Sequence, residues 1–164
     1  MKLIDGMGQL GTLLKNRVCG EKNNDDAIVY HTWNIDDKSM DAQKKEHAKF
    51  CNFVKQNKHE KIIFISTSSQ NESFYVKYKQ LSESFLIQNC KNCLVLRFPT
   101  LIGKGVFEDF KSNKKKPYGV MNIMTLDRAC DIVIEHLNYN GLLKILSFDG
   151  HEVDAKIVYN LVRV

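Results

Sequence analysis

The sequence predicts an α/β fold, built on an open parallel sheet with helices on both faces. Short apolar runs rich in β-branched residues alternate with longer stretches of helical period, and this alternation is typical of a parallel sheet with right-handed crossovers. The expected strands are residues 2–4, 27–33, 61–67, 93–98, 120–125 and 143–148. The expected helices are residues 9–17, 38–57, 72–89, 126–138 and 152–163. With 164 residues and no internal repeat, the chain is long enough for one domain with its own core.

Short polar residues mark where two of these helices are expected to begin. Asp36 and Asp37 precede the second helical stretch and Asn71 precedes the third. Their side-chain oxygens are of the kind that accept a hydrogen bond from the first free backbone N–H groups of a helix. In an open parallel sheet, ligands bind outside the carboxyl ends of the strands, so the residues just after each strand are the ones to consider for function.

The composition is that of an ordinary globular protein, with 43% hydrophobic and 26% charged residues. No apolar run reaches the roughly 18 residues that a membrane span needs. The first residues, MKLIDGMGQLG, lack the apolar stretch of a secretory signal. We therefore expect a cytoplasmic protein with no membrane partner.

The five cysteines are scattered, and an odd number without an export signal predicts reduced thiols. Cys90 and Cys93, in CKNC, have the spacing of a redox motif or of half a zinc site. A zinc site needs a second ligand pair with matching spacing, which the sequence does not offer. The favoured interpretation is a helix end leading into a strand, and no metal is expected.

The net charge is +5, with a local cluster of lysines in KSNKKK, residues 111–116. A solvated loop is the favoured interpretation, followed by contact with an anionic ligand. Nucleic acid is the least favoured partner, because no aromatic residues interleave the lysines and no nucleic-acid-reading motif is present.

A glycine-rich turn joins the first expected strand to the first expected helix. Gly6, Gly8 and Gly11 form a G-x-G-x-x-G pattern, which lets backbone approach a pyrophosphate at a helix N-terminus. The pattern alone is weak evidence, and a glycine turn that binds nothing is the alternative. Its position at the first strand-to-helix junction favours a dinucleotide.

Hydroxyls, a tyrosine and a lysine follow the third expected strand. The strand ends in STSS, residues 66–69, and Tyr75 and Lys79 come next, one helical turn apart. The hydroxyls could simply cap a helix. Tyrosine normally keeps its proton to about pH 10, so it serves as a base at neutral pH only if its pKa is lowered. A lysine ammonium one turn away, with a cationic nicotinamide nearby, would lower that pKa.

These segments carry a family resemblance. KIIFISTSS, then YVKYKQLSE, then NCLVLRFPTLIGKG resemble, in the same order, the extended short-chain dehydrogenase/reductase family of NAD(P)-dependent nucleotide-sugar epimerases, dehydratases and reductases. MGQLG resembles the dinucleotide loop of dTDP-4-dehydrorhamnose reductases. MNIMTLDRACDIVIEHL is similar to a family segment in which a strand leads into a helix with an acidic start. The resemblance implies a Rossmann-like domain over residues 1–164, with a reduced substrate region over residues 105–164.

The resemblance also implies roles for particular residues. Tyr75 would be the general acid/base, and Lys79 would hold the nicotinamide ribose and lower the pKa of Tyr75. Thr67, or alternatively Ser68, would hydrogen-bond the reacting group of the substrate. Glu83 is too far along the helix for chemistry and is expected at the surface or against a dimer partner.

Further implied roles concern ligands and assembly. Gly6, Gly8 and Gly11 would cradle the pyrophosphate of NAD or NADP, while Arg97 and Pro99 would shape the wall beside a nucleotide-linked sugar. The helices over residues 38–57 and 72–89 resemble the pair that forms dimer interfaces in the family, so a homodimer is expected.

The sequence departs from the family in several places, including a short stretch between Thr67 and Tyr75. The first helix leads almost directly into the strand at 27–33, so the second and third βα units, which bind the adenosine half of the cofactor, are expected to be missing. Asp5 stands where the family has its first glycine, and Trp33 stands where it has small residues.

The favoured function is an NAD(P)-dependent oxidoreductase or epimerase acting on a nucleotide-linked sugar, with a role in surface polysaccharide biosynthesis. The alternative is a non-catalytic binding or scaffolding protein that has lost the cofactor.

Overall fold

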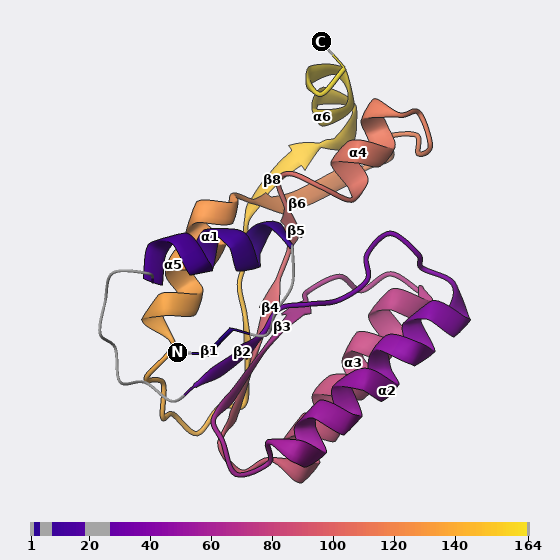
Figure 1. The fold of residues 1–164 in the computed structure, drawn as a ribbon. Helices are drawn as coiled ribbons and strands as arrows, with labels where there is room; N and C mark the ends of the chain where they lie inside the picture. Colours follow the sequence, from indigo (N-terminus) through magenta and orange to yellow (C-terminus); the bar gives the residue numbers. More distant parts are fainter. Residues whose placement is uncertain (1, 4–7, 19–26, 164) are drawn as a thin grey trace.

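A parallel five-stranded sheet forms the centre of the molecule in the computed structural model, which describes residues 2–3, 8–18 and 27–163 (Figure 1). The strand order is β1-β2-β3-β4-β7, with every neighbouring pair parallel. The strands are β1 (Lys2–Leu3), β2 (Ile28–Tyr30), β3 (Ile62–Thr67), β4 (Cys93–Phe98) and β7 (Ile145–Ser147). The predicted open α/β fold is therefore confirmed.

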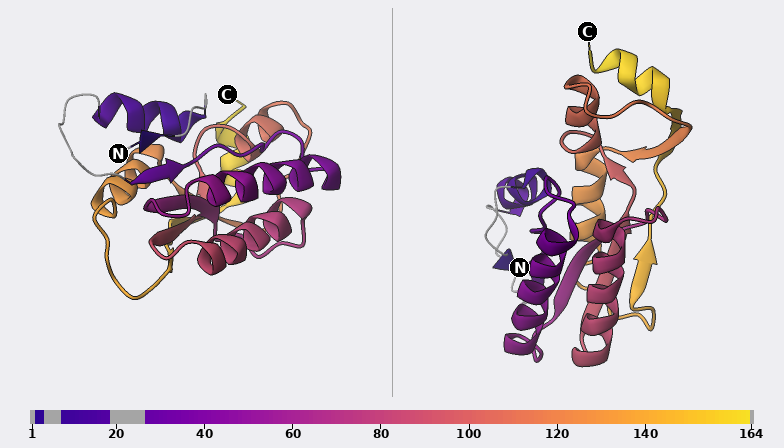
Figure 2. Two further views of the ribbon diagram at one scale, coloured as in Figure 1. Left: turned by 60° about the horizontal axis from the view of Figure 1, so that its bottom comes forward. Right: turned by 90° about the vertical axis from the view of Figure 1, so that its right-hand side faces the viewer.

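Helices cover both faces of this sheet. α1 (Gln9–Val18) and α5 (Leu126–Glu135) lie on one face, and α2 (Met40–Gln56) and α3 (Phe74–Asn89) run side by side on the other (Figures 1 and 2). β3 shows how one strand serves both layers. Ile63 and Ile65 belong to the core under α1 and α5, whereas Ile62 and Phe64 belong to the core under α2 and α3. This alternation follows from the two-residue period of a strand.

The helix starts differ from those expected. Ser39 is the N-cap of α2, and Ser73 is the N-cap of α3. Asp37 and Asn71 lie two residues earlier and support these serines instead: the Asp37 carboxylate accepts from the Ser39 backbone N–H at 2.9 Å, and the Asn71 side chain accepts from the Ser73 hydroxyl at 2.8 Å. Prediction of Asp36, Asp37 and Asn71 as caps was therefore wrong, because several cap-competent residues stand together at each boundary.

A second, smaller sheet extends beyond the first, with order β5-β6-β8. It consists of β5 (Thr100–Leu101), β6 (Val120–Met124) and β8 (His151–Asp154), packed with α4 (Val106–Lys111) and α6 (Ala155–Leu161). The strand expected at 120–125 thus lies outside the main sheet. The helix expected over 152–163 is also shorter, since β8 takes its first residues by antiparallel pairing with β6. Neither β5 nor α4 was predicted.

The described part of the main sheet contains no counterpart of the family's second and third βα units, whose loss the sequence predicts. β1 pairs directly with β2, in the register Lys2 to Ile28, and residues 19–26 alone separate α1 from the segment that leads into β2. Within the described residues, no further strand pairs with the outer edge of β1. The predicted loss of the second and third βα units is therefore confirmed.

None of the described helices combines the length and apolar character that crossing a membrane requires.

Candidate functional site

Tyr75 and Lys79 lie next to each other in the first turns of α3, after the carboxyl end of β3. Tyr75 is half-buried, whereas only 4% of Lys79 is exposed. The Lys79 ammonium lies 5.9 Å from the centroid of the Tyr75 ring. The helical spacing of four residues brings the two side chains to one face of α3, and this face points toward the sheet.

The Lys79 ammonium is enclosed by aromatic rings, which we call the aromatic cage (Trp33, Phe64 and Tyr75). Its Nζ lies 4.5 Å from the Trp33 ring centroid and 4.6 Å from that of Phe64. It also donates a hydrogen bond of 2.6 Å to the backbone carbonyl of Ile65. Ring faces and a carbonyl oxygen are suitable partners for a buried cation. The ammonium is therefore engaged by the protein itself.

Burial sets the proton affinity of both side chains. Desolvation lowers the pKa of Lys79 to about 7, against the opposing charges of Glu83 and Glu46. Desolvation also raises the pKa of Tyr75 to about 12. The latter shift is opposite to the one that a general base at neutral pH needs, and the Lys79 ammonium does not overcome it. The expected lowering of the Tyr75 pKa is absent from this arrangement.

Trp33 is held in place over Lys79 by hydrogen bonds to α2. Its indole Nε1 donates to the Gln43 side-chain oxygen at 2.8 Å. Gln43 is fully buried, and its side-chain nitrogen donates to the backbone carbonyls of Asn34 and Asp37 at 2.9 and 2.6 Å. Because each side-chain group of Gln43 is satisfied, the indole cannot move away without breaking a buried hydrogen bond. Sequence reasoning singled out Trp33 but not Gln43, which carries no recognisable motif.

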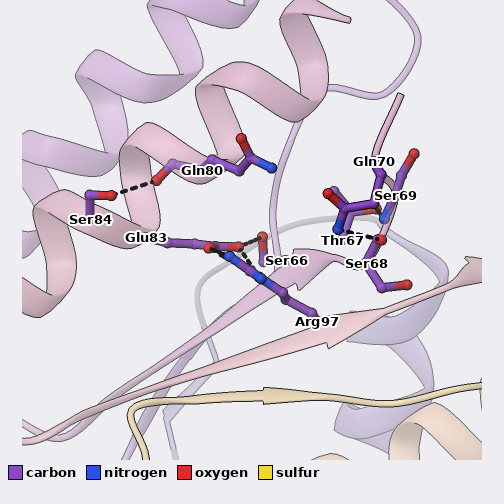
Figure 3. Close-up of polar contacts among 9 residues, drawn as sticks. All are labelled: Ser66, Thr67, Ser68, Ser69, Gln70, Gln80, Glu83, Ser84 and Arg97. Carbon is purple, nitrogen blue, oxygen red and sulfur yellow. Dashed lines mark hydrogen bonds and ion pairs between the residues drawn. The ribbon is translucent and has the colours of Figure 1, made fainter. Parts of the chain in front are cut away.

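Thr67 and Ser68 form hydrogen bonds within the segment that ends β3 and follows it (Figure 3). The Thr67 hydroxyl accepts a hydrogen bond from the Ser69 backbone N–H at 3.1 Å. The Ser68 backbone N–H donates to the Phe98 carbonyl at 2.9 Å. The Ser68 carbonyl accepts from the Gln70 side chain at 3.3 Å. The Thr67 bond is a local turn interaction between a hydroxyl and the backbone. The bond from Ser68 to Phe98 holds the start of the loop beside the end of β4.

Glu83 is a buried residue, so the expectation that it lies on the surface was wrong. It is 2% exposed and accepts a hydrogen bond of 2.5 Å from the Ser66 hydroxyl (Figure 3). Arg97 Nε donates to both carboxylate oxygens at 3.1 Å, and Arg97 Nη2 forms an ion pair with Glu83 Oε2. The interpretation failed because residues four apart share a helix face, and the face of Tyr75 and Lys79 is the one that packs on the sheet.

The Ser66–Glu83–Arg97 cluster joins three elements: α3, β3 and β4. Hydrogen bonding to Glu83 raises the pKa of Arg97 further above its usual range. The Arg97 guanidinium therefore binds the Glu83 carboxylate within the protein. Pro99, its predicted companion, is buried between β4 and β5.

The predicted pyrophosphate loop is only partly described. Gly6, like Asp5, lies outside the described residues, whereas a Cβ added at Gly8 would meet no other atom within 4 Å. Gly11 lies against His31, and a Cβ there would be 2.0 Å from the His31 ring. The third glycine of the pattern thus permits close approach of α1 to the end of β2, the packing role that such a glycine has in dinucleotide folds.

Two surface cavities lie away from the Tyr75–Lys79 pair. One of about 520 Å³ is bordered by the loop after β3 and the first turns of α3, including Glu72, Phe74 and Lys77. The other, of about 250 Å³, lies at the amino end of β4 and is lined by residues that include Cys93 and Lys144. Neither is lined by Tyr75 or Lys79.

Comparison with known proteins matches the fold but not the sequence. No protein-family model and no curated protein matches this sequence. Among solved structures, a dTDP-4-dehydrorhamnose reductase from Clostridium acetobutylicum is similar over 100% of this chain and 82% of its own, at 15% identity and a TM-score of 0.70. UDP-N-acetylglucosamine 4-epimerase from Bacillus cereus is similar over 97% and 81%, at 14% identity and a TM-score of 0.69.

A third similar structure is the Bordetella bronchiseptica enzyme WbmG in complex with NAD and UDP, at 15% identity and a TM-score of 0.65. The match covers 94% of this chain but only 59% of WbmG, so the chain spans little more than half the length of that enzyme. At these identities the likeness establishes the fold alone. The predicted resemblance to extended short-chain dehydrogenase/reductases is thereby confirmed at the level of the fold.

The described residues fit the dinucleotide of such enzymes poorly. Lys79 would have to leave the Ile65 carbonyl and the aromatic cage to reach a ribose, and Trp33 covers it. The edge of β1, where the adenosine half would be bound, has no described βα units beside it. We therefore assign no chemical step to a nicotinamide at this site.

The buried carboxylate of Glu83 predicts a loss of stability on neutralisation. Glu83→Gln should lower the free energy of unfolding by about 2 kcal/mol, because Arg97 and Ser66 lose a charged acceptor in a dry environment. Urea denaturation measures the change. Glu72→Gln, at an exposed position before α3, is the matched control and should change stability by less than about 0.5 kcal/mol. Equal, small effects of both substitutions would contradict the buried role.

The lowered pKa of Lys79 predicts a pH-dependent stability. Between about pH 7 and about pH 10.5 the unfolded chain holds more protons on this side chain than the folded chain, so the free energy of unfolding rises with pH. Lys79→Met removes this contribution. The free energy of unfolding of the variant minus that of the unsubstituted protein should therefore decrease as the pH rises from about 7 to about 9.5. Urea denaturation at several pH values checks this, with the exposed Lys77→Met as control. A constant difference for Lys79→Met would refute the shift.

Proposed function

We propose that this chain is a non-catalytic binding protein that keeps the fold of NAD(P)-dependent nucleotide-sugar enzymes and acts by associating with another chain of the same fold. The observation that carries the proposal is the Lys79 ammonium, which lies under Trp33 and donates to the Ile65 carbonyl. A lysine in this state is part of the core, and it is not available for a ribose.

The proton affinities support the same conclusion. With a pKa of about 12, Tyr75 keeps its proton at neutral pH and is a poor base. With a pKa of about 7, Lys79 is only partly charged there, which weakens the electrostatic effect that would acidify Tyr75. Tyr75 and Lys79, to which the resemblance assigns catalysis, are thus better suited to a packing role than to proton transfer.

An apolar stripe on α3 supports association as the activity. Phe74 and Leu81 are each 44% exposed, and the half-buried Tyr78 and Phe85 continue the stripe at the spacing of one helix face. His47 of α2 borders it, with ring centroids 5.9 Å from Tyr78 and 6.5 Å from Phe85. α2 and α3 form one outer layer of the molecule (Figure 2).

The proposed partner for this stripe is a second copy of this chain, which would form a homodimer through a four-helix layer. Leucine and aromatic side chains spaced along one helix face are suited to helix–helix packing of this kind. A longer enzyme of the same fold, engaged in surface polysaccharide biosynthesis, is the further partner that this surface would accept.

A second candidate function is the enzyme that the sequence favoured: an NAD(P)-dependent oxidoreductase or epimerase acting on a nucleotide-linked sugar. It is favoured by one observation, the order of Thr67, Ser68, Tyr75 and Lys79 around the carboxyl end of β3, on a fold shared with such enzymes. In that function Tyr75 would be the acid/base, and Trp33 would have to leave Lys79 before Gly8 and Gly11 could help to hold a cofactor.

Cofactor titration distinguishes the two functions. Trp33 is the only tryptophan in the chain, so its fluorescence reports directly on the space beside Lys79. We expect no saturable change with NADH or NADPH up to about 1 mM, which corresponds to binding weaker than about −4 kcal/mol. Lys79→Ala is the matched variant, and it too should show no saturable change in fluorescence when NADH or NADPH is added. Saturable quenching that Lys79→Ala weakens would establish the enzyme site instead.

Substitution of the stripe tests association. Leu81→Glu should shift the protein from dimer to monomer in sedimentation velocity at micromolar concentration, because a carboxylate would be buried against an apolar surface. Leu142→Glu is the control, since Leu142 is 99% exposed in a loop away from α3. A monomer before any substitution excludes the homodimer, and mixing with a longer enzyme of this fold then tests the other partner.

A further inference from the structure

Cys90 and Cys93 form a reduced thiol pair where α3 ends and β4 begins. Cys90 is the C-cap of α3, and Cys93 is the first residue of β4. Both are free thiols, and they are 2% and 5% exposed. The Cys93 thiol donates to the Cys90 carbonyl at 3.2 Å, and the Cys90 thiol donates to the Asn92 carbonyl at 3.4 Å. The two residues are therefore neighbours in the folded protein.

Lysine side chains converge on this junction. Lys91 lies between the two cysteines in the chain, and Lys144 Nζ donates to the Lys91 carbonyl at 2.6 Å. Lysines beside a thiol favour its thiolate, which is the nucleophile in cysteine chemistry. Interaction with the Cys93 thiol lowers the pKa of Cys90 to about 7, with a contribution from Lys144 and against desolvation. The same interaction, together with burial, raises the pKa of Cys93, so Cys90 is the more acidic thiol of the pair.

A cavity of about 250 Å³ opens beside the pair, and we call it the lysine cavity. Its lining includes Cys93 together with Lys91, Lys144, Tyr139 and Gly141. It lies at the amino end of β4, whereas Tyr75 follows the carboxyl end of the parallel strand β3, so it is separate from the site described above. Of the two thiols, Cys93 is the one that lines it.

The other described cysteines lack this combination. Cys51 lies on α2 and Cys130 on α5, and burial raises the pKa of each thiol. Neither lines the lysine cavity. They are therefore internal controls within the same chain.

We propose that Cys90 and Cys93 are a thiol–disulfide exchange site, which takes a small disulfide bearing carboxylate groups into the lysine cavity. The lysines would attract the carboxylates, and Cys93 would meet the disulfide first because it lines the cavity. This site is independent of the proposed function, since it uses neither the Tyr75–Lys79 pair nor the α3 stripe.

The exchange proceeds in two balanced steps. The pair first releases one proton to solvent, which leaves the thiolate on Cys90. Cys90 then takes the proton of Cys93 as Cys93 meets the small disulfide. The Cys93 thiolate then attacks one sulfur of the small disulfide, so that a mixed disulfide forms and one small thiolate leaves. Cys90 next loses its proton, and its thiolate attacks the Cys93 sulfur and expels the second small thiolate. The two released thiolates take up the two protons, so the protein thiols are oxidised by two electrons to a disulfide and the small disulfide is reduced to two thiols.

Oxidised glutathione, which carries carboxylates, tests the proposal on the full, folded chain. After incubation, free thiols are alkylated and the protein is cut with trypsin, which cleaves after Lys91, between the two cysteines. We expect peptides 80–91 and 92–97 to remain joined until a reductant is added. Protein in denaturing urea is the positive control for the bond. Alkylated, separate peptides from the folded protein, with joined peptides from the unfolded one, would overturn the proposal.

Variants test the order of the two steps and the part played by charge. Cys90→Ser should keep glutathione on peptide 92–97, whereas Cys93→Ser should acquire it far more slowly and Cys130→Ser should still form the disulfide. Lys144→Gln should slow the reaction with oxidised glutathione by about threefold or more but leave that with uncharged hydroxyethyl disulfide unchanged. Equal slowing of both reagents would refute the anion-attracting cavity. Equal adducts on Cys51 and Cys130 would refute the site.

Discussion

The burial of one ammonium group determines how this molecule is organised around its third strand. Lys79 enters the layer between α3 and the sheet, and a cation there must be compensated. Trp33, Phe64 and the Ile65 carbonyl provide that compensation from two strands and their loops. Gln43, which holds the indole, extends the same arrangement to α2. One buried group thereby connects the segments around β2 and β3 with α2 and α3.

A second buried charge lies one turn further along α3. Glu83 is compensated by Arg97 and Ser66, so that the helix is attached to β3 and β4 by directional bonds as well as by apolar contact. Buried ion pairs add little net stability compared with apolar residues of similar size, but removing one partner is costly. In this chain they define the register of α3 on the sheet. The same register half-buries Tyr75 against the sheet, and this desolvation explains why its pKa rises although an ammonium lies close by.

Much of the fold could be predicted because its signals are local. The apolar runs that became β3 and β4, and the periodic stretches that became α2 and α3, are long and uninterrupted. The small second sheet could not be predicted in the same way, because β5 has two residues and β8 exists through its pairing with β6. The caps at Ser39 and Ser73 were missed since neighbouring Asp and Asn residues carry the same signal. Glu83 was misplaced because spacing along a helix says which residues share a face, not which face is buried.

The sequence by itself determined the parallel α/β architecture, the shortened adenosine side of the sheet and the adjacency of Tyr75 and Lys79, since each follows from periodicity, segment order or helical spacing. Tertiary structure alone decided the state of those residues. Whether an ammonium meets solvent, a ribose or an indole depends on side chains from other elements, such as Trp33 and Gln43, whose approach no local pattern encodes. It likewise brought Lys144 beside Cys93, from a segment that lies far along the chain.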